Sequence, residues 1–115
     1  MNASQTTIQL DRIFGALADS TRRAILDRAY RGEVTVNELV AGFDLSQPTI
    51  SKHLKVLERA GLISRGREAQ FRPVRIEAPA LAGADRWLGA YRRLWEDRLG
   101  RLDRVVEDLK QQGDA

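Results

Sequence analysis

The chain contains two closely spaced helix starts followed by one helix stop, and this pattern constrains its fold more than any other feature. Thr35 and Glu38 form a capping box, in which each side chain accepts a hydrogen bond from the other residue's backbone amide. Ser46 is a second N-cap, and Gly61 with Leu62 suits a left-handed helix end with an apolar partner. Residues 35–60 therefore predict two short helices joined by a turn, which is a helix-turn-helix pattern.

The residues after this pattern predict a β-hairpin over about residues 62–76. Two apolar segments, Leu62–Arg65 and Gln70–Ile76, flank the polar tip Gly66-Arg67-Glu68-Ala69. Because Pro73 cannot donate a hydrogen bond to a sheet, we expect the second strand to be an edge strand. A hairpin directly after a helix-turn-helix is a wing.

Three further helices are indicated by apolar spacing and caps. The first carries an apolar stripe, and Asp19 caps the second, Ser20 to about Arg31. The last runs over about residues 79–111, where Leu88, Trp95, Leu102 and Leu109 recur every seven residues. Its glycines Gly83, Gly89 and Gly100 predict a kink or break. We expect a mainly α fold with one small β-hairpin, in the order α-α-α-α-β-β-α, as a single domain over residues 1–115.

Composition narrows the class of protein. The 115 residues include no cysteine, so neither disulfides nor thiolate metal sites are available. No apolar segment is long enough to span a bilayer, and the N-terminus lacks the basic and apolar regions of a signal peptide. We expect a cytoplasmic protein that does not contact membranes.

Basic residues are concentrated in the helix-turn-helix and the hairpin. The net charge is +3, but Ser46–Ile76 holds seven basic residues and two acidic ones, which makes this segment +5 and the remainder −2. Such a patch on a nearly balanced protein predicts a polyanionic partner, and the alternative is a solvated surface with chance clustering.

The second helix of the pattern has the composition of a DNA-recognition helix. Polar side chains that can read base edges occupy its first turns, cations follow, and the hairpin tip carries arginines that can reach the minor groove or phosphates. The predicted contacts to double-stranded DNA are Ser46, Gln47, Pro48, Thr49, Ser51, Lys52, His53, Lys55, Arg65, Arg67, Gln70 and Arg72. The alternatives are an ordinary solvated helix face and a charged strand edge that prevents sheet aggregation.

The apolar repeat of the last helix predicts a homodimer. The expected interface residues are Leu88, Tyr91, Trp95, Leu102, Val105 and Leu109. A ligand pocket lined by Trp87 and Trp95 is the alternative to this shared core.

An enzymatic function is not expected. His53 is the only histidine and has no nucleophile or metal-ligand partner in the neighbouring sequence, so we predict no catalytic residue, no metal and no cofactor. The function predicted from the residues is sequence-specific binding of double-stranded DNA by a dimer. A protein-interaction module that uses the winged helix without specific DNA binding is the alternative.

Three segments together resemble a known family. Leu17–Leu26, Leu45–Leu57 and Ala60–Ile63 are similar to the ArsR/SmtB group of bacterial winged-helix repressors, with Ser20 where that group often has proline. The resemblance covers about residues 8–110.

This resemblance implies the same helix and strand order, a dimer built from the first and last helices, and repression that is relieved when a signal changes the dimer. The interface residues that it adds on the first helix are Leu10, Ile13 and Phe14. We expect the dimer to bind a pseudo-palindromic operator, which can lie in the protein's own promoter.

The chain departs from the metal-sensing members of this group. Their cysteine motif would fall at Val36–Val40, which offers no thiol, and the last helix has no histidine. The sequence Trp87–Glu96 resembles instead the branch that senses no metal. If the protein responds to an effector, we expect an unidentified small molecule and not a metal; the sequence leaves open whether such an effector exists.

Overall fold

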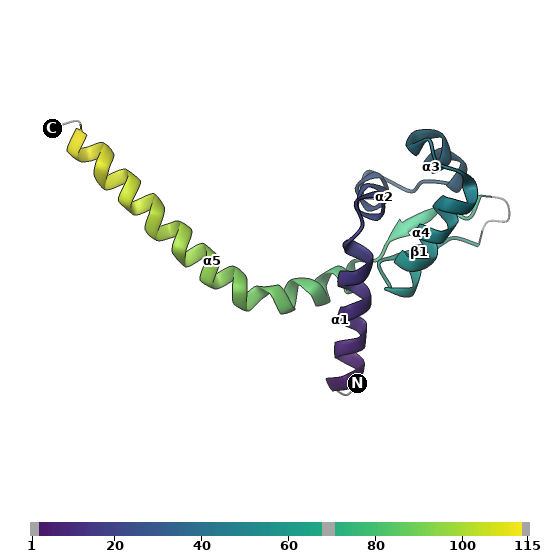
Figure 1. Ribbon diagram of the computed structural model, residues 1–115, viewed down its shortest axis with the longest axis horizontal. Helices are drawn as coiled ribbons and strands as arrows, with labels where there is room; N and C mark the ends of the chain where they lie inside the picture. The colour runs from purple at the N-terminus through teal and green to yellow at the C-terminus, as the bar shows by residue number, and fades with distance from the viewer. Residues whose placement is uncertain (1–2, 68–70, 114–115) are drawn as a thin grey trace. The chain divides into compact units, whose positions relative to one another are not determined.

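A computed structural model describes residues 3–67 and 71–113 (Figure 1). The predicted fold class is confirmed, because the described chain is mainly helical with one antiparallel hairpin. The elements are α1 (Ala3–Leu17), α2 (Ser20–Tyr30), α3 (Val36–Phe43), α4 (Gln47–Arg59), β1 (Ile63–Arg65), β2 (Val74–Ile76) and α5 (Ala78–Gly113).

The chain divides into two compact units, Met1–Ala84 and Asp85–Ala115. The first unit holds α1 to α4, both strands and the start of α5. The second consists of the remainder of α5. The first unit thus contains the whole helix-turn-helix and the wing, and the single domain expected over residues 1–115 stays a prediction.

The helix ends confirm the predicted caps. The Thr35 side chain accepts from the backbone amide of Glu38 at 3.2 Å, and the Glu38 carboxylate accepts from that of Thr35 at 3.2 Å. Gly61 has a φ of 74°, and Leu62 donates to the carbonyl of Leu57 at 3.0 Å, which is the six-to-one bond of a left-handed helix end. These local bonds fix where α3 starts and where α4 stops.

The hydrophobic core of the first unit is formed by one face of each of its helices, packed together. Leu39 of α3, Ile50, Leu54 and Leu57 of α4, and Ile25 of α2 are all essentially inaccessible to solvent. Ile13 of α1 belongs to this core and is only 2% exposed. The side chain of Ile13 is thus already covered by its own chain, and its expected contact with a second chain stays a prediction.

The hairpin differs from the prediction in two respects. Its strands are shorter than expected and pair Ile63 with Ile76 and Arg65 with Val74. The second strand is also not a free edge, since Val74 exchanges two backbone hydrogen bonds with Val34, which precedes α3. Pro73 lies just outside the strand, and its carbonyl accepts from Gly66 at 2.8 Å. The missing donor of Pro73 therefore removes no ladder bond.

The helical assignment of α5 continues through Gly83, Gly89 and Gly100, so the helix does not break at these glycines, and the alternative of a kink stays a prediction. A glycine costs a helix about 1 kcal/mol relative to alanine, which is too little to end a helix of this length. Within the second unit, Trp87 and Tyr91 pack with ring centroids 5.1 Å apart. No helix in the described ranges is long and apolar enough to span a membrane.

Candidate nucleic-acid interface

The recognition helix α4 starts at a side-chain cap that also engages one of the predicted DNA contacts. The Ser46 hydroxyl accepts from the backbone amide of Thr49 at 3.3 Å and lies 2.8 Å from the Thr49 hydroxyl. Pro48 follows the cap in the first turn and remains exposed. The cap thus holds the first turn of α4, where base-reading side chains are expected, in one conformation.

A polar hollow of about 360 Å³ lies between α4, the start of α3 and the wing. The structure brings five predicted DNA contacts together around it, namely Gln47, Ser51, Lys55, Arg65 and Arg72. Three of the five are basic and come from α4 and the hairpin, and Glu58 of α4 is the acidic residue of the lining. Such an arrangement suits a polyanion that runs between a helix and a wing.

The same hollow includes residues that the sequence did not single out for binding. Thr35 and Asn37 come from the start of α3, and Phe71 comes from the wing, where it is 64% exposed. The capping box indicated where α3 begins, but nothing in the sequence indicated that this end faces α4 and the hairpin. An exposed aromatic beside cations can contact a sugar or a thymine methyl.

The two wing arginines that line the hollow, Arg65 and Arg72, are connected by a hydrogen bond within the wing. The Nε of Arg65 donates to the backbone carbonyl of Arg72 at 3.1 Å. Burial lowers the pKa of the Arg65 guanidinium, and the positive charge of Arg72 lowers it further. Arg72 has a φ of 27°, a backbone region that residues other than glycine seldom adopt. Arg65 is thus fixed beside Arg72, and Glu58 of α4, which also lines the hollow, acts in the opposite direction and raises the pKa of Arg65.

The remaining predicted contacts are placed differently. Lys52 and Arg67 are exposed and do not line the hollow. Placed at about 100° per residue, Lys52 lies nearly opposite the buried stripe of α4 and so faces outward. Gln70 lies outside the described residues.

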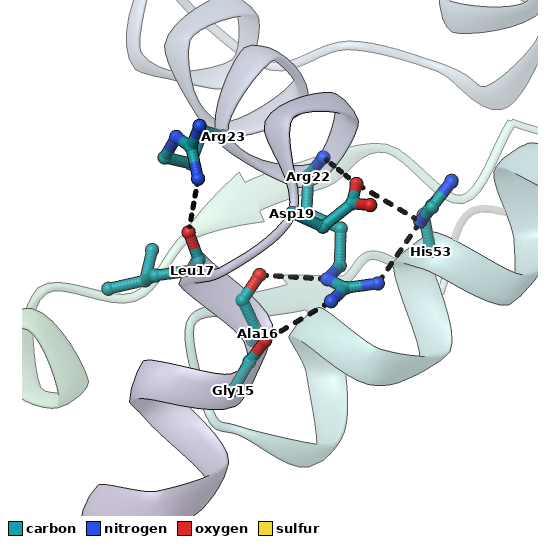
Figure 2. A network of polar contacts seen from close by, with 7 residues as sticks. All are labelled: Gly15, Ala16, Leu17, Asp19, Arg22, Arg23 and His53. Atoms are coloured by element: carbon teal, nitrogen blue, oxygen red, sulfur yellow. Dashed lines mark hydrogen bonds and ion pairs between the residues drawn. The ribbon is translucent and has the colours of Figure 1, made fainter.

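His53 belongs to a polar network that connects α4 to α1 and α2 (Figure 2). Its Nδ1 lies 3.4 Å from a guanidinium nitrogen of Arg22 and 3.9 Å from the carboxylate of Asp19. Arg22 also donates to the carbonyls of Gly15 at 3.1 Å and Ala16 at 2.8 Å, near the end of α1. His53 therefore contributes to the packing between these helices, and its contact to DNA stays a prediction.

Asp19 supplies the acidic group of this network and caps α2. Its carboxylate accepts from the backbone amide of Arg22 at 3.0 Å, which lowers its pKa below the ordinary value of 3.8, and the charges of Arg22 and His53 add to this effect. A lowered pKa in the folded state means that the unfolded state binds the proton first as the pH falls. The stabilisation is therefore present above the ordinary pKa and is lost in more acidic solution.

We expect Asp19→Asn to lower the melting temperature at pH 7, because the neutral amide keeps a capping oxygen but loses the charge. The difference from the unchanged protein should shrink as the pH falls from about 5 to 3, where Asp19 itself becomes neutral. Thermal unfolding followed by circular dichroism measures both values. Asp11→Asn, on exposed α1 surface, is the matched control. A difference that stays constant across this range would contradict the role of the charge.

The predicted dimer residues fall into two groups. On α1, Leu10 and Phe14 are half-buried, and Ile13 is in the core. On the second unit, the apolar side chains are exposed, and Trp95 is 62% exposed. The exposed residues of the predicted set are Leu88, Tyr91, Trp95, Leu102, Val105 and Leu109.

The fold and this interface define a winged helix-turn-helix protein whose α4 and wing form one basic surface. Comparison with known proteins agrees with this class, because residues 17–65 match the family described as a helix-turn-helix domain. One relative is the transcriptional repressor SdpR of Bacillus subtilis. It is 34% identical to this chain over 79 residues, which cover 69% of this chain and 88% of SdpR.

Solved structures show the same relationship. A crystal structure of an ArsR family transcriptional regulator is 41% identical, with a TM-score of 0.71 over 78% of this chain and 93% of that one. A homodimeric winged helix-turn-helix DNA-binding domain from Mycobacterium bovis is 24% identical, with a TM-score of 0.60 over 88% and 93% of the two chains, and supports the fold alone. The chain belongs to the ArsR family of DNA-binding transcriptional regulators and is not an enzyme.

The chain's side chains do not suggest a metal sensor. Among the residues that the structure describes, no three histidine, cysteine, aspartate or glutamate side chains gather into a potential metal site. The chain has no cysteine and one histidine, and that histidine contacts Arg22. Soft transition metals would thus lack their preferred ligands.

Proposed function

We propose that this protein is a homodimeric repressor that binds a pseudo-palindromic operator in double-stranded DNA, in the cytoplasm. The observation that carries the proposal is the hollow in which the start of α3, α4 and the wing converge. Its lining combines an amide and a hydroxyl that can read base edges, Gln47 and Ser51, with three cations that can contact phosphates. SdpR is named a repressor, which supports repression over activation.

In this mechanism the α4 helices of two subunits enter successive major grooves. Gln47, Ser51 and Lys52 read base edges, while Lys55, Arg65 and Arg72 contact the backbone. Arg67 at the hairpin tip reaches the flanking minor groove. The half-site centres should lie about 34–36 Å apart, one turn of DNA. Bound operator then excludes the transcription machinery from the promoter.

The second copy is expected along α5, whose apolar side chains recur every seven residues and are exposed. An isolated helix cannot bury such a stripe, and a partner helix with the same stripe can. The Mycobacterium bovis domain, which shares this fold, is described as homodimeric.

Titration onto labelled DNA tests this function. The protein should bind a fragment from upstream of its own gene about a thousandfold more tightly than a scrambled fragment, with a steep dependence on salt. A series of fragments from neighbouring promoters serves as a second set of candidate operators. Equal weak binding to every fragment would contradict specific repression and would favour the protein-interaction alternative.

A further inference from the structure

A second hollow lies between α1 and α4, with none of the residues of the DNA-facing hollow in its lining. Its volume is about 620 Å³, and it is lined by Arg12, Gly15, Ala16, Val56 and Arg59. The floor is apolar and flat, because Gly15 and Ala16 have little or no side chain and Val56 is 37% exposed. A Cβ built on Gly15 would meet no heavy atom within 4 Å, so this part of the floor is open.

Arginines stand on both walls of this groove. Arg12 belongs to α1 and Arg59 to α4, and both are exposed. Neither forms a hydrogen bond or ion pair with any residue in the described ranges, whereas Arg28 and Arg75 of the same unit pair with glutamates. The groove therefore holds two positive charges and has no acidic residue in its lining.

An apolar floor between two unpaired guanidinium groups matches one kind of small molecule. Guanidinium groups bind carboxylates through charge-assisted hydrogen bonds, and pockets of about 300–1,000 Å³ that combine apolar lining with a few polar groups are typical of ligand sites. We propose that this groove binds a small carboxylate with an aliphatic body, of the fatty-acid type. Arg12 and Arg59 hold its head group, and the body lies along Gly15, Ala16 and Val56.

The position of the groove gives such a ligand a route to the recognition helix. Two sets of side-chain hydrogen bonds connect α1 to α4 and its C-cap. Gln9 donates to the carbonyl of Ala60 at 2.9 Å, and Arg22 links the carbonyls of Gly15 and Ala16 to His53. A ligand in the groove contacts both helices and shifts the protein toward whichever α1–α4 arrangement binds it better. The effect on DNA rests on the proposed function, but binding in the groove does not.

The test is a titration of ¹⁵N-labelled full-length protein with decanoate, with 1-decanol as the uncharged control. Decanoate should shift the amide signals of Gly15, Ala16 and Val56, and decanol should bind at least about tenfold more weakly. Arg12→Gln combined with Arg59→Gln should weaken decanoate binding by at least the same factor. Arg101→Gln, on exposed α5 surface, removes one charge elsewhere and should change nothing.

Filling the groove gives an independent variant. Gly15→Leu places a side chain in the open space, and it should favour the helix because leucine is a better helix former than glycine. It should abolish the decanoate-induced shifts. Shifts confined to the apolar face of α5, or unaffected by both variants, would overturn the proposal. Arginine variants that weaken DNA binding while leaving decanoate affinity unchanged would also overturn it, since Arg12 and Arg59 would then be phosphate contacts.

The same samples separate this proposal from the proposed function. Decanoate should change the affinity of the unchanged protein for its operator and leave that of Gly15→Leu unaffected. If the unchanged protein binds decanoate in the groove but no DNA fragment specifically, the repressor function fails and the ligand site stands.

Discussion

Trp95→Arg is expected to convert the dimer into a monomer and to weaken operator binding by about 100- to 10,000-fold. Trp95 is 62% exposed on the second unit and lies in the repeat that also contains Leu88 and Leu102. An arginine in the centre of a paired helix would have to lose its hydration without an acidic partner. A monomer then binds one half-site only and loses the gain in affinity that comes from linking two binding modules.

Light scattering gives the mass and fluorescence anisotropy gives the affinity. Ala90→Arg is the matched control, because it adds the same charge on an exposed position away from the apolar repeat and should leave the dimer intact. Circular dichroism checks that the winged-helix unit remains folded in both variants. A Trp95→Arg protein that stays dimeric and binds the operator normally would show that the repeat is not the interface.

The features that sequence alone predicted well are those built from neighbouring residues. The Thr35–Glu38 capping box, the Ser46 cap and the left-handed turn at Gly61 each depend on bonds within one or two helical turns. Residue identity at a fixed spacing is sufficient for such features. The order of helices followed from these ends, and so did the position of the recognition helix.

Sequence alone could not predict contacts between segments that are distant in the sequence. Apolar spacing correctly placed Ile13 on the inner stripe of α1, but spacing cannot show whether a stripe packs on its own chain or on a second one. The pairing of Val34 with Val74 was missed for the same reason, because one residue of extended backbone has no periodicity. Thr35 and Asn37 joined the candidate interface only once the fold placed α3 beside the wing.

The second large effect is expected for Lys52→Glu, which should weaken operator binding by about 30-fold or more. Lys52 is exposed on the side of α4 that faces away from the buried stripe, so its charge adds nothing to the core. A contact to guanine or phosphate is worth about 1–3 kcal/mol, and a homodimer loses it twice. Each lost phosphate contact also lowers the slope of log affinity against log salt by about 0.9, so a phosphate role predicts a slope reduced by about 2 per dimer.

The salt series separates the two roles that Lys52 can have. A base contact predicts that Lys52→Glu lowers specific binding and leaves the slope nearly unchanged, whereas a phosphate contact weakens binding to operator and scrambled DNA alike. Lys110→Glu makes the same chemical change on exposed α5 and should have little effect on either fragment. If the two glutamate variants weaken binding equally, the effect comes from net charge, and α4 would not be the helix that enters the major groove.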